Sequence, residues 1–110
     1  MNILVRVVFP VDSGNAAVAD PGFGGTIQKI FADQKAEAIY FHPSGGQRAI
    51  SYVTDVSDGS RIPSLVEPWW LRYRADVTLT PVFTPKEMEK AVSGIAADVS
   101  KYYRPELVEV

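Results

Sequence analysis

His42 is the only histidine among the 110 residues, and histidine is the side chain that most readily exchanges a proton near neutral pH. It ends a predicted strand beside the turn 43–46, within reach of groups near Gln47 and Arg48. Placed there, it could serve as a general base or a haem ligand. It could also be a solvent-facing turn residue, and this plainer interpretation is the one we favour.

Arg6 is the second candidate, because it lies inside the apolar first strand of the chain. A guanidinium group in such a setting needs a carboxylate or an anionic ligand. A structural ion pair is the preferred interpretation, and a substrate clamp is the alternative. The expected neighbours on its face of the sheet are Thr78, Thr80 and, from the hairpin, either Asp55 with Ser51 or Tyr40 with Tyr52.

Several classes of function are excluded by what the sequence lacks. With no cysteine and one histidine, neither a disulfide framework, a structural zinc site nor a Ser-His-Asp triad can be built, and we expect no metal and no cofactor. The carboxylates are too dispersed for a glycosidase-like pair. A net charge of −2 with scattered basic residues argues against nucleic acid, and the apolar runs are too short to cross a membrane. These features fit a cytoplasmic protein.

The glycine-rich segment 20–26 follows a strand and precedes a helix, as a phosphate-binding loop does. It lacks both the Gly-Lys-Ser/Thr of a P-loop and the spacing of the dinucleotide fingerprint. A plain flexible entry to the helix is therefore preferred over an anion site.

Two adjacent tryptophans lie in the predicted helix 62–73, which also contains Pro68. Helical spacing puts Trp69 in the core, Trp70 on the flank and Leu71 on the opposite side. Pro68 should kink this helix unless its first turn starts late. For Trp70 and Leu71, packing against the C-terminal helix is favoured, with a dimer contact and a pocket wall as alternatives.

The remaining patterns predict the elements that position these residues. Alternating or apolar runs predict strands at 2–9, 36–42, 48–56 and 76–83, and helices at 26–35, 62–73 and 85 to about 103. Residues 84–87 form a capping box, and 104–105 should stop the last helix. Residues 10–25 are expected to be a long connection with at most a short helical turn at 15–19.

The order of these elements predicts a single α+β domain over 1–110. We expect a ferredoxin-like β-α-β-β-α-β sheet with helices on one face and an extra C-terminal helix.

The other face of that sheet would leave Leu4 and Val8 uncovered. A second copy of the sheet is a better cover than water, and a two-fold dimer is the commonest solution. We therefore expect a homodimer.

The run YFHPSGGQRAISYVTDVSDGSRIPSLVEPWW followed by ADVTLTPVFTPKEMEKA resembles a small bacterial family of uncharacterised proteins in the dimeric α/β-barrel superfamily. The resemblance covers about residues 36–91. It implies a homodimer whose two sheets close a barrel, and it implies no settled activity. No catalytic residue of the superfamily can be carried over to a position in this sequence.

Our main hypothesis is a homodimer that binds a small organic molecule between the sheet and the helices. The expected walls of that site are Arg6, Tyr40, His42, Tyr52 and Trp70. Two alternatives remain open: a cofactor-independent or haem-dependent monooxygenase-like enzyme, and a structural or interaction module without a ligand.

Overall fold

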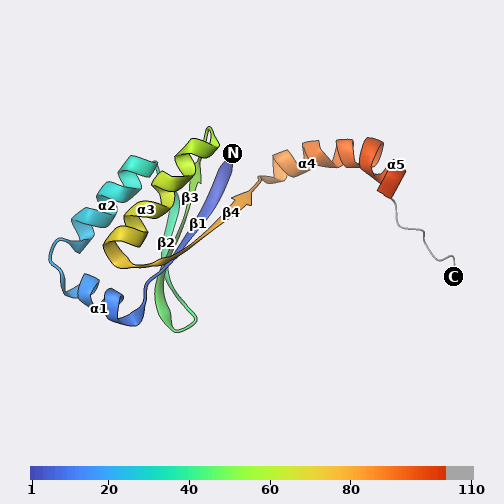
Figure 1. Ribbon diagram of the computed structural model, residues 1–110. Helices are drawn as coiled ribbons and strands as arrows, with labels where there is room; N and C mark the ends of the chain where they lie inside the picture. Colours follow the sequence, from blue (N-terminus) through green and yellow to red (C-terminus); the bar gives the residue numbers. More distant parts are fainter. Residues whose placement is uncertain (104–110) are drawn as a thin grey trace.

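The computed structural model describes residues 1–103, which form one four-stranded antiparallel sheet and five α-helices (Figure 1). The strands are β1 (Asn2–Val8), β2 (Glu37–Ser44), β3 (Gln47–Asp55) and β4 (Asp76–Val82), in the order β2-β3-β1-β4. The helices are α1 (Val11–Ala19), α2 (Phe23–Gln34), α3 (Ile62–Tyr73), α4 (Pro85–Gly94) and α5 (Ser100–Tyr103). A 3₁₀ turn (Gly59–Arg61) precedes α3, and a π-helical segment (Ile95–Val99) joins α4 to α5. The predicted α+β class and antiparallel sheet are confirmed.

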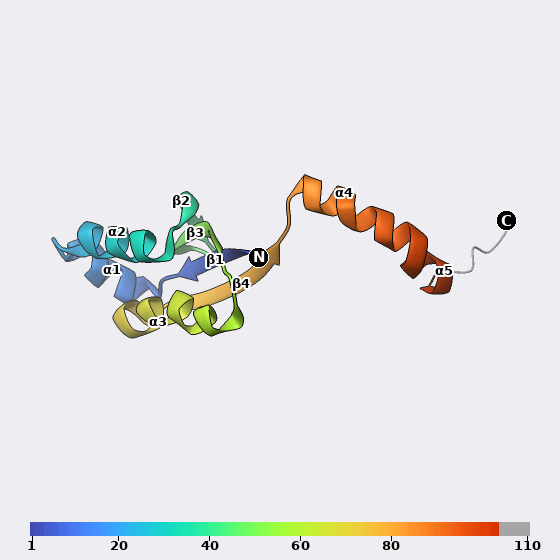
Figure 2. The same ribbon diagram turned by 90° about the horizontal axis from the view of Figure 1, so that it is seen from above.

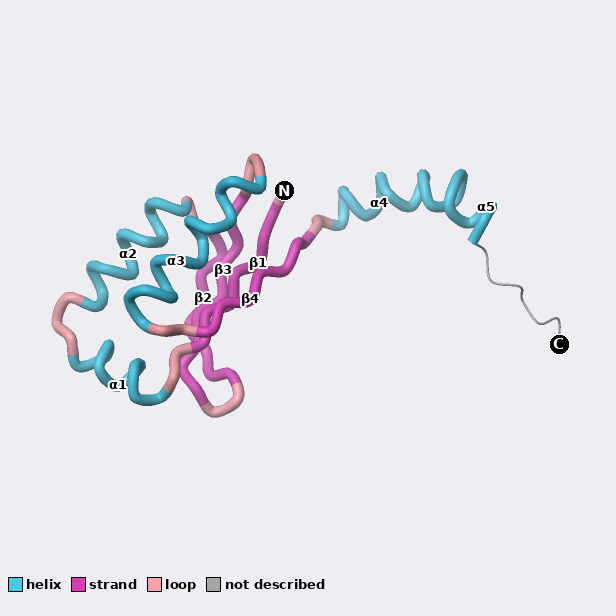
Figure 3. Tube along the Cα trace, viewed as in Figure 1, coloured by secondary structure: helices cyan, strands magenta, loops and turns pink. Residues whose placement is uncertain are grey.

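Helices α1, α2 and α3 cover one face of the sheet (Figures 1 and 3). Alternation along β1 sends Ile3, Val5 and Val7 into the core beneath these helices, where each is at most 2% exposed. Leu4, Arg6 and Val8 point to the opposite face. We call that opposite side of the sheet the uncovered face, since none of α1, α2 and α3 lies on it.

A hydrogen-bonded chain of polar groups runs through the core and ties α2 to α3 and β3. The indole Nε1 of Trp69 donates to the Tyr52 hydroxyl at 3.0 Å, and that hydroxyl donates to Oε1 of Gln34. The Nε2 group of Gln34 then donates to the carbonyl oxygens of Ser64 and Leu65 at 3.3 and 3.2 Å. The buried side chains of Trp69, Tyr52 and Gln34 are therefore all hydrogen-bonded, as polar groups in a core must be.

Pro68 lies inside α3, and its missing N–H group should leave the carbonyl of Ser64 without a partner. Gln34 supplies that partner from the neighbouring helix. The α-helix therefore runs from Ile62 to Tyr73, as predicted from the sequence, with the proline inside it.

Gly45 and Gly46 form the two-residue turn between β2 and β3, with φ angles of 56° and 79°. Positive φ at both positions is what a type I′ hairpin requires, and glycine adopts it without strain. The ladder that follows pairs Tyr40 with Ser51 and His42 with Ala49.

The long connection predicted for residues 10–25 is wrong. Most of it is helical: α1 occupies Val11–Ala19, and α2 begins at Phe23 rather than at Thr26. Pro10 is the N-cap residue of α1, and Asp12 lies in its first turn. Proline just before a helix and an acid in its first turn are both favourable at a helix start.

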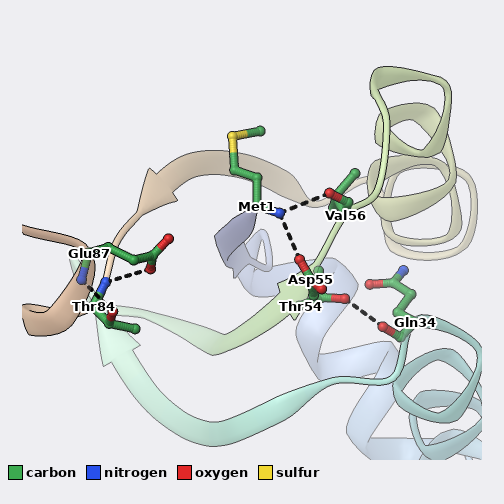
Figure 4. Close-up of polar contacts among 7 residues, drawn as sticks. All are labelled: Met1, Gln34, Thr54, Asp55, Val56, Thr84 and Glu87. Atoms are coloured by element: carbon green, nitrogen blue, oxygen red, sulfur yellow. Dashed lines mark hydrogen bonds and ion pairs between the residues drawn. The ribbon is translucent and has the colours of Figure 1, made fainter. Parts of the chain in front are cut away.

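The end of the chain leaves the domain. Thr84 and Glu87 make both hydrogen bonds of the predicted capping box (Figure 4), and the helix then projects away from the sheet (Figures 1 and 2). The radius of gyration is 19.0 Å, against roughly 13 Å for a compact chain of about this length. The predicted stop at residues 104–105 lies outside the described residues.

Three hydrogen bonds fix the end of the sheet where β1 begins and β3 ends (Figure 4). The ammonium group of Met1 donates to Asp55 at 2.8 Å and to the carbonyl of Val56 at 3.1 Å. Thr54 donates to the backbone carbonyl of Gln34 at 2.6 Å, which holds the end of α2 against β3.

Candidate functional site

A cleft of about 750 Å³ lies between α1 and the hairpin of β2 and β3. Its walls come from the end of β1, from α1, from the start of α2 and from both strands of the hairpin. Most of the lining side chains are apolar, and the polar ones gather where Arg48 meets α1. The lining residues are Phe9, Val11, Gly14, Asn15, Ala17, Val18, Phe23, Phe41, His42, Pro43, Gly46, Gln47, Arg48, Ala49 and Ile50.

Several apolar side chains of the cleft remain open to solvent. Val11, Val18 and Phe41 are 55%, 60% and 62% exposed, whereas Phe9 at the base is 3% exposed. Phe9 is fixed by edge-to-face contacts with Phe23 and Tyr73, at centroid distances of 6.3 and 5.3 Å. The cleft thus has a rigid aromatic base and an accessible apolar rim, as small-molecule sites commonly have.

Arg48 is the cation of this cleft. Its Nη1 donates to Oδ1 of Asn15 at 3.0 Å, and it passes so close to Gly14 that a Cβ at that position would lie 3.0 Å from Nη1. No carboxylate of residues 1–103 lies within ion-pair distance of it. The guanidinium is therefore oriented by a neutral partner and keeps its charge available for an anion.

The uncovered face brings together three of the five residues that the sequence suggested. Arg6 lies opposite Ser51 on one side and Thr78 on the other, and Tyr40 is paired with Ser51. Nε2 of His42 is 2.7 Å from the Ser51 hydroxyl, and Nδ1 is 2.9 Å from the Pro43 carbonyl. Arg6, Tyr40 and His42 thus share one face, and His42 alone of the five also lines the cleft.

Tyr52 does not belong to that group. It lies on the helix-covered face with no exposed surface, and its hydroxyl is used by Trp69 and Gln34. Burial raises the pKa of Tyr52 to about 12, since the charged phenolate would be poorly solvated there. It is a member of the core network and is separated from Arg6 by the sheet itself.

Trp70 is also remote from the uncovered face. Trp69 is fully buried, as predicted, whereas Trp70 and Leu71 are 48% and 81% exposed on the outer side of α3. The expected packing of these two residues against the C-terminal helix is not observed, since that helix projects away from the domain (Figure 2). Trp70 is not among the residues that line the cleft.

The sequence interpretation missed Arg48, Asn15 and the apolar wall of α1. The available signal was Val11, Gly14 and Val18 at helical spacing behind a proline, with Asp12 near the start.

The described residues hold no group of three or more histidine, aspartate and glutamate side chains placed to bind a metal ion. Within residues 1–103, no helix has both the length and the apolar character needed to cross a bilayer.

No protein-family model matches this sequence, and a search of curated proteins found no significant match.

Proposed function

We propose that this chain is a small-molecule-binding domain that works as a homodimer. The cleft between α1 and the hairpin carries the binding part, because it combines an apolar cavity with one positioned and unpaired cation. The ligand class that fits is a small organic anion with an apolar body, such as a short-chain or aromatic carboxylate. The apolar body would contact Phe9 and Phe41, and the carboxylate would pair with Arg48.

The uncovered face supports the dimer. It presents Leu4, Val8 and Val53, none of them fully buried, around the guanidinium of Arg6. A sheet of this kind needs a second layer, and a copy of the same chain supplies one in a closed two-fold assembly. Sedimentation equilibrium of the full chain at micromolar concentration tests this, and a monomer throughout would overturn it.

A ferredoxin-like arrangement of the strands and helices completes the proposal. The strand order β2-β3-β1-β4 with antiparallel neighbours supports the ferredoxin-like part. Helix α1 is an addition to that arrangement, and it forms one wall of the cleft.

The binding part is tested by an NMR titration of the ¹⁵N-labelled chain with octanoate and, in parallel, with octanol. The two probes share an apolar chain and differ in the carboxylate. We expect octanoate to shift the amides of α1 and the hairpin and to bind about tenfold more tightly than octanol, as expected for one charge-assisted hydrogen bond.

Arg48→Met should remove the preference for octanoate while leaving octanol binding unchanged. Lys29→Met is the matched control, since Lys29 is an exposed cation on α2 that pairs with Asp33 at 3.0 Å. If neither probe shifts the cleft amides, or if Lys29→Met has the same effect as Arg48→Met, the proposed site is wrong.

A further inference from the structure

Two surfaces that carry apolar side chains meet nothing in the described residues. One is the uncovered face of the sheet, and the other is a stripe along the C-terminal helix. The stripe consists of Met88, Val92, Ile95, Val99 and Tyr102, which are between 43% and 74% exposed. The spacing of four, three, four and three residues places them along one side of the helix.

The helix has little to stabilise it on its own. All residues from Phe83 to Val99 are exposed. An isolated helix of this length is only marginally stable in water, because most helical stability in proteins comes from packing an apolar face. The capping box at Thr84 fixes where the helix starts, and the apolar stripe needs a surface to pack against.

The charges of the two surfaces are complementary. Arg6 lies in the central strand of the uncovered face, exposed and without an ion pair in the described chain. On α4, Glu89 lies on the flank of the helix, about 100° around the axis from Met88, whereas Lys86 and Lys90 lie on the side opposite the stripe. Laying the stripe on the sheet would therefore bring a carboxylate, and neither lysine, toward Arg6.

The two surfaces also match in length. The helical segment 85–103 is about 28 Å long at 1.5 Å per residue. A strand of seven to nine residues, as in this sheet, spans about 23–30 Å. Helix α4 starts only two residues after β4 and runs away from its own sheet (Figures 1 and 2). The stripe therefore does not pack on the sheet of its own chain.

We propose that the C-terminal helix of each chain docks on the uncovered face of a second copy, with Glu89 of one copy paired to Arg6 of the other. This exchange rests on the proposed homodimer and names the segments that form it. It covers the uncovered face and the apolar stripe of both chains in one closed two-fold assembly. Direct packing of one sheet on another would instead leave the stripe of each helix uncovered.

Cysteine cross-linking distinguishes the possible arrangements, because the chain has no cysteine of its own. Thr78→Cys places a thiol beside Arg6 on the uncovered face, and Val92→Cys places one on the stripe near Glu89. We expect a disulfide-linked dimer when the two singly substituted chains are mixed and mildly oxidised. We expect none from either variant alone.

Each other product overturns the exchange. A linked dimer from Thr78→Cys alone indicates sheet-on-sheet packing, and one from Val92→Cys alone indicates helix-on-helix packing. A monomeric intrachain disulfide in the doubly substituted chain indicates that the helix folds back on its own sheet. No cross-link in any combination, with a dimer still seen by sedimentation, also rejects the exchange and leaves the homodimer standing. A monomeric parent chain rejects both.

Charge reversal tests the ion pair. We expect Arg6→Glu and Glu89→Arg each to weaken the dimer about tenfold, and the double variant to recover most of the affinity. Lys90→Glu is the matched control, since it changes the charge of the adjacent residue on the far side of the helix. Single losses without recovery in the double variant, or an equal loss in Lys90→Glu, would reject the pairing.

Discussion

The side-chain amide of Gln34 donates a hydrogen bond to the carbonyl oxygen of Ser64, at an Nε2–O distance of 3.3 Å. Ser64 is the residue whose carbonyl would accept the backbone amide of residue 68 in a regular helix, and residue 68 is proline. A glutamine on α2 thus replaces a bond that α3 cannot make, and α3 can contain a proline without leaving this partly buried acceptor unpaired.

This replacement predicts that the effects of Gln34 and Pro68 on stability are coupled. Gln34→Leu should lower the free energy of unfolding by about 1–3 kcal/mol, because it removes the acceptor of the Tyr52 hydroxyl and the side-chain donor to the Ser64 carbonyl. In a Pro68→Ala background the helix can satisfy Ser64 itself, so the loss should be smaller by about 1 kcal/mol. Urea unfolding of the four proteins in this double-mutant cycle measures the coupling.

Gln28→Leu is the control for this cycle, since Gln28 is exposed on the same helix. Its effect should be within about 0.5 kcal/mol of zero in both backgrounds. Strictly additive values for Gln34→Leu and Pro68→Ala would mean that Gln34 does not compensate for the proline.

Two buried tyrosines should respond in opposite ways to loss of the hydroxyl group. The Tyr52 hydroxyl bonds to Trp69 and Gln34, so Tyr52→Phe should cost about 1–3 kcal/mol. The Tyr73 hydroxyl is buried without a hydrogen-bond partner among the described residues, so Tyr73→Phe should be neutral or stabilising. Thermal or urea unfolding of the two variants gives the comparison, and a larger loss in Tyr73→Phe would contradict it.

The same hydroxyl predicts a loss of stability in alkali. Burial raises the pKa of Tyr52 to about 12, above the value near 10 of an unfolded chain. Between these values the unfolded chain releases the proton and the folded chain keeps it, so the free energy of unfolding falls as pH rises. The contribution is intact below pH 10 and decreases by about 2 kcal/mol by pH 12.

Urea unfolding at about pH 9 and pH 11.5 measures this loss. Tyr52→Phe lacks the titrating group and should show a shallower decline over the same interval. Equal slopes in the parent and the variant would assign the alkaline loss to other groups.

The sequence predicted the elements whose signals are local. Pro85 and the Thr84–Glu87 capping box mark the start of α4, and Gly45-Gly46 marks the hairpin turn. Each of these short patterns strongly favours one backbone conformation. Helix α1 was missed because a nine-residue helix with a glycine in its interior carries a weak periodic signal. Its stability comes from contacts with the sheet and with α3, and such contacts between distant residues are not visible in a local pattern.

The site was less predictable than the fold for a related reason. Arg6, Tyr40 and His42 share a face because side chains along a strand point alternately to the two faces of the sheet. This alternation can be predicted for each strand from its sequence. Tyr52 falls on the other face because Tyr40 pairs with Ser51, and pairing register is decided by the hairpin as a whole. The meeting of Asn15 with Arg48 joins residues 33 positions apart, so it could not be read from either segment alone.

The capping box predicts a local effect of Thr84→Ala. The Thr84 hydroxyl accepts from the Glu87 amide at 3.1 Å, and the Glu87 carboxylate accepts from the Thr84 amide at 2.9 Å. Losing the hydroxyl should cost about 1 kcal/mol of helix stability, or about a fivefold fall in hydrogen-exchange protection through α4. Amides of β1 should be unchanged, and Thr84→Ser should retain the protection.

Acid should weaken the same helix start. Hydrogen bonds from the Thr84 backbone amide and hydroxyl lower the pKa of Glu87. A lowered pKa means that the capping interaction is complete above the ordinary glutamate range and is lost as pH falls through the lowered value. Exchange in α4 measured at pH 6 and at about pH 3 should show this loss in the parent, with a smaller loss in Glu87→Gln.

Gly14→Ala separates the stability of α1 from its role at the cleft. Alanine favours a helix interior over glycine by about 1 kcal/mol, which should stabilise α1. The new methyl group would lie 3.0 Å from Nη1 and 3.4 Å from Cδ of Arg48, so the flexible arginine must move away from Asn15. We therefore expect a protein that is at least as stable as the parent but binds octanoate several-fold more weakly, with octanol binding unchanged.

Gly24→Ala is the control, since nothing lies within 4 Å of a Cβ at that position in α2. Unchanged octanoate affinity in Gly14→Ala, measured by the same NMR titration, would show that the placement of Arg48 by α1 does not matter for the anion.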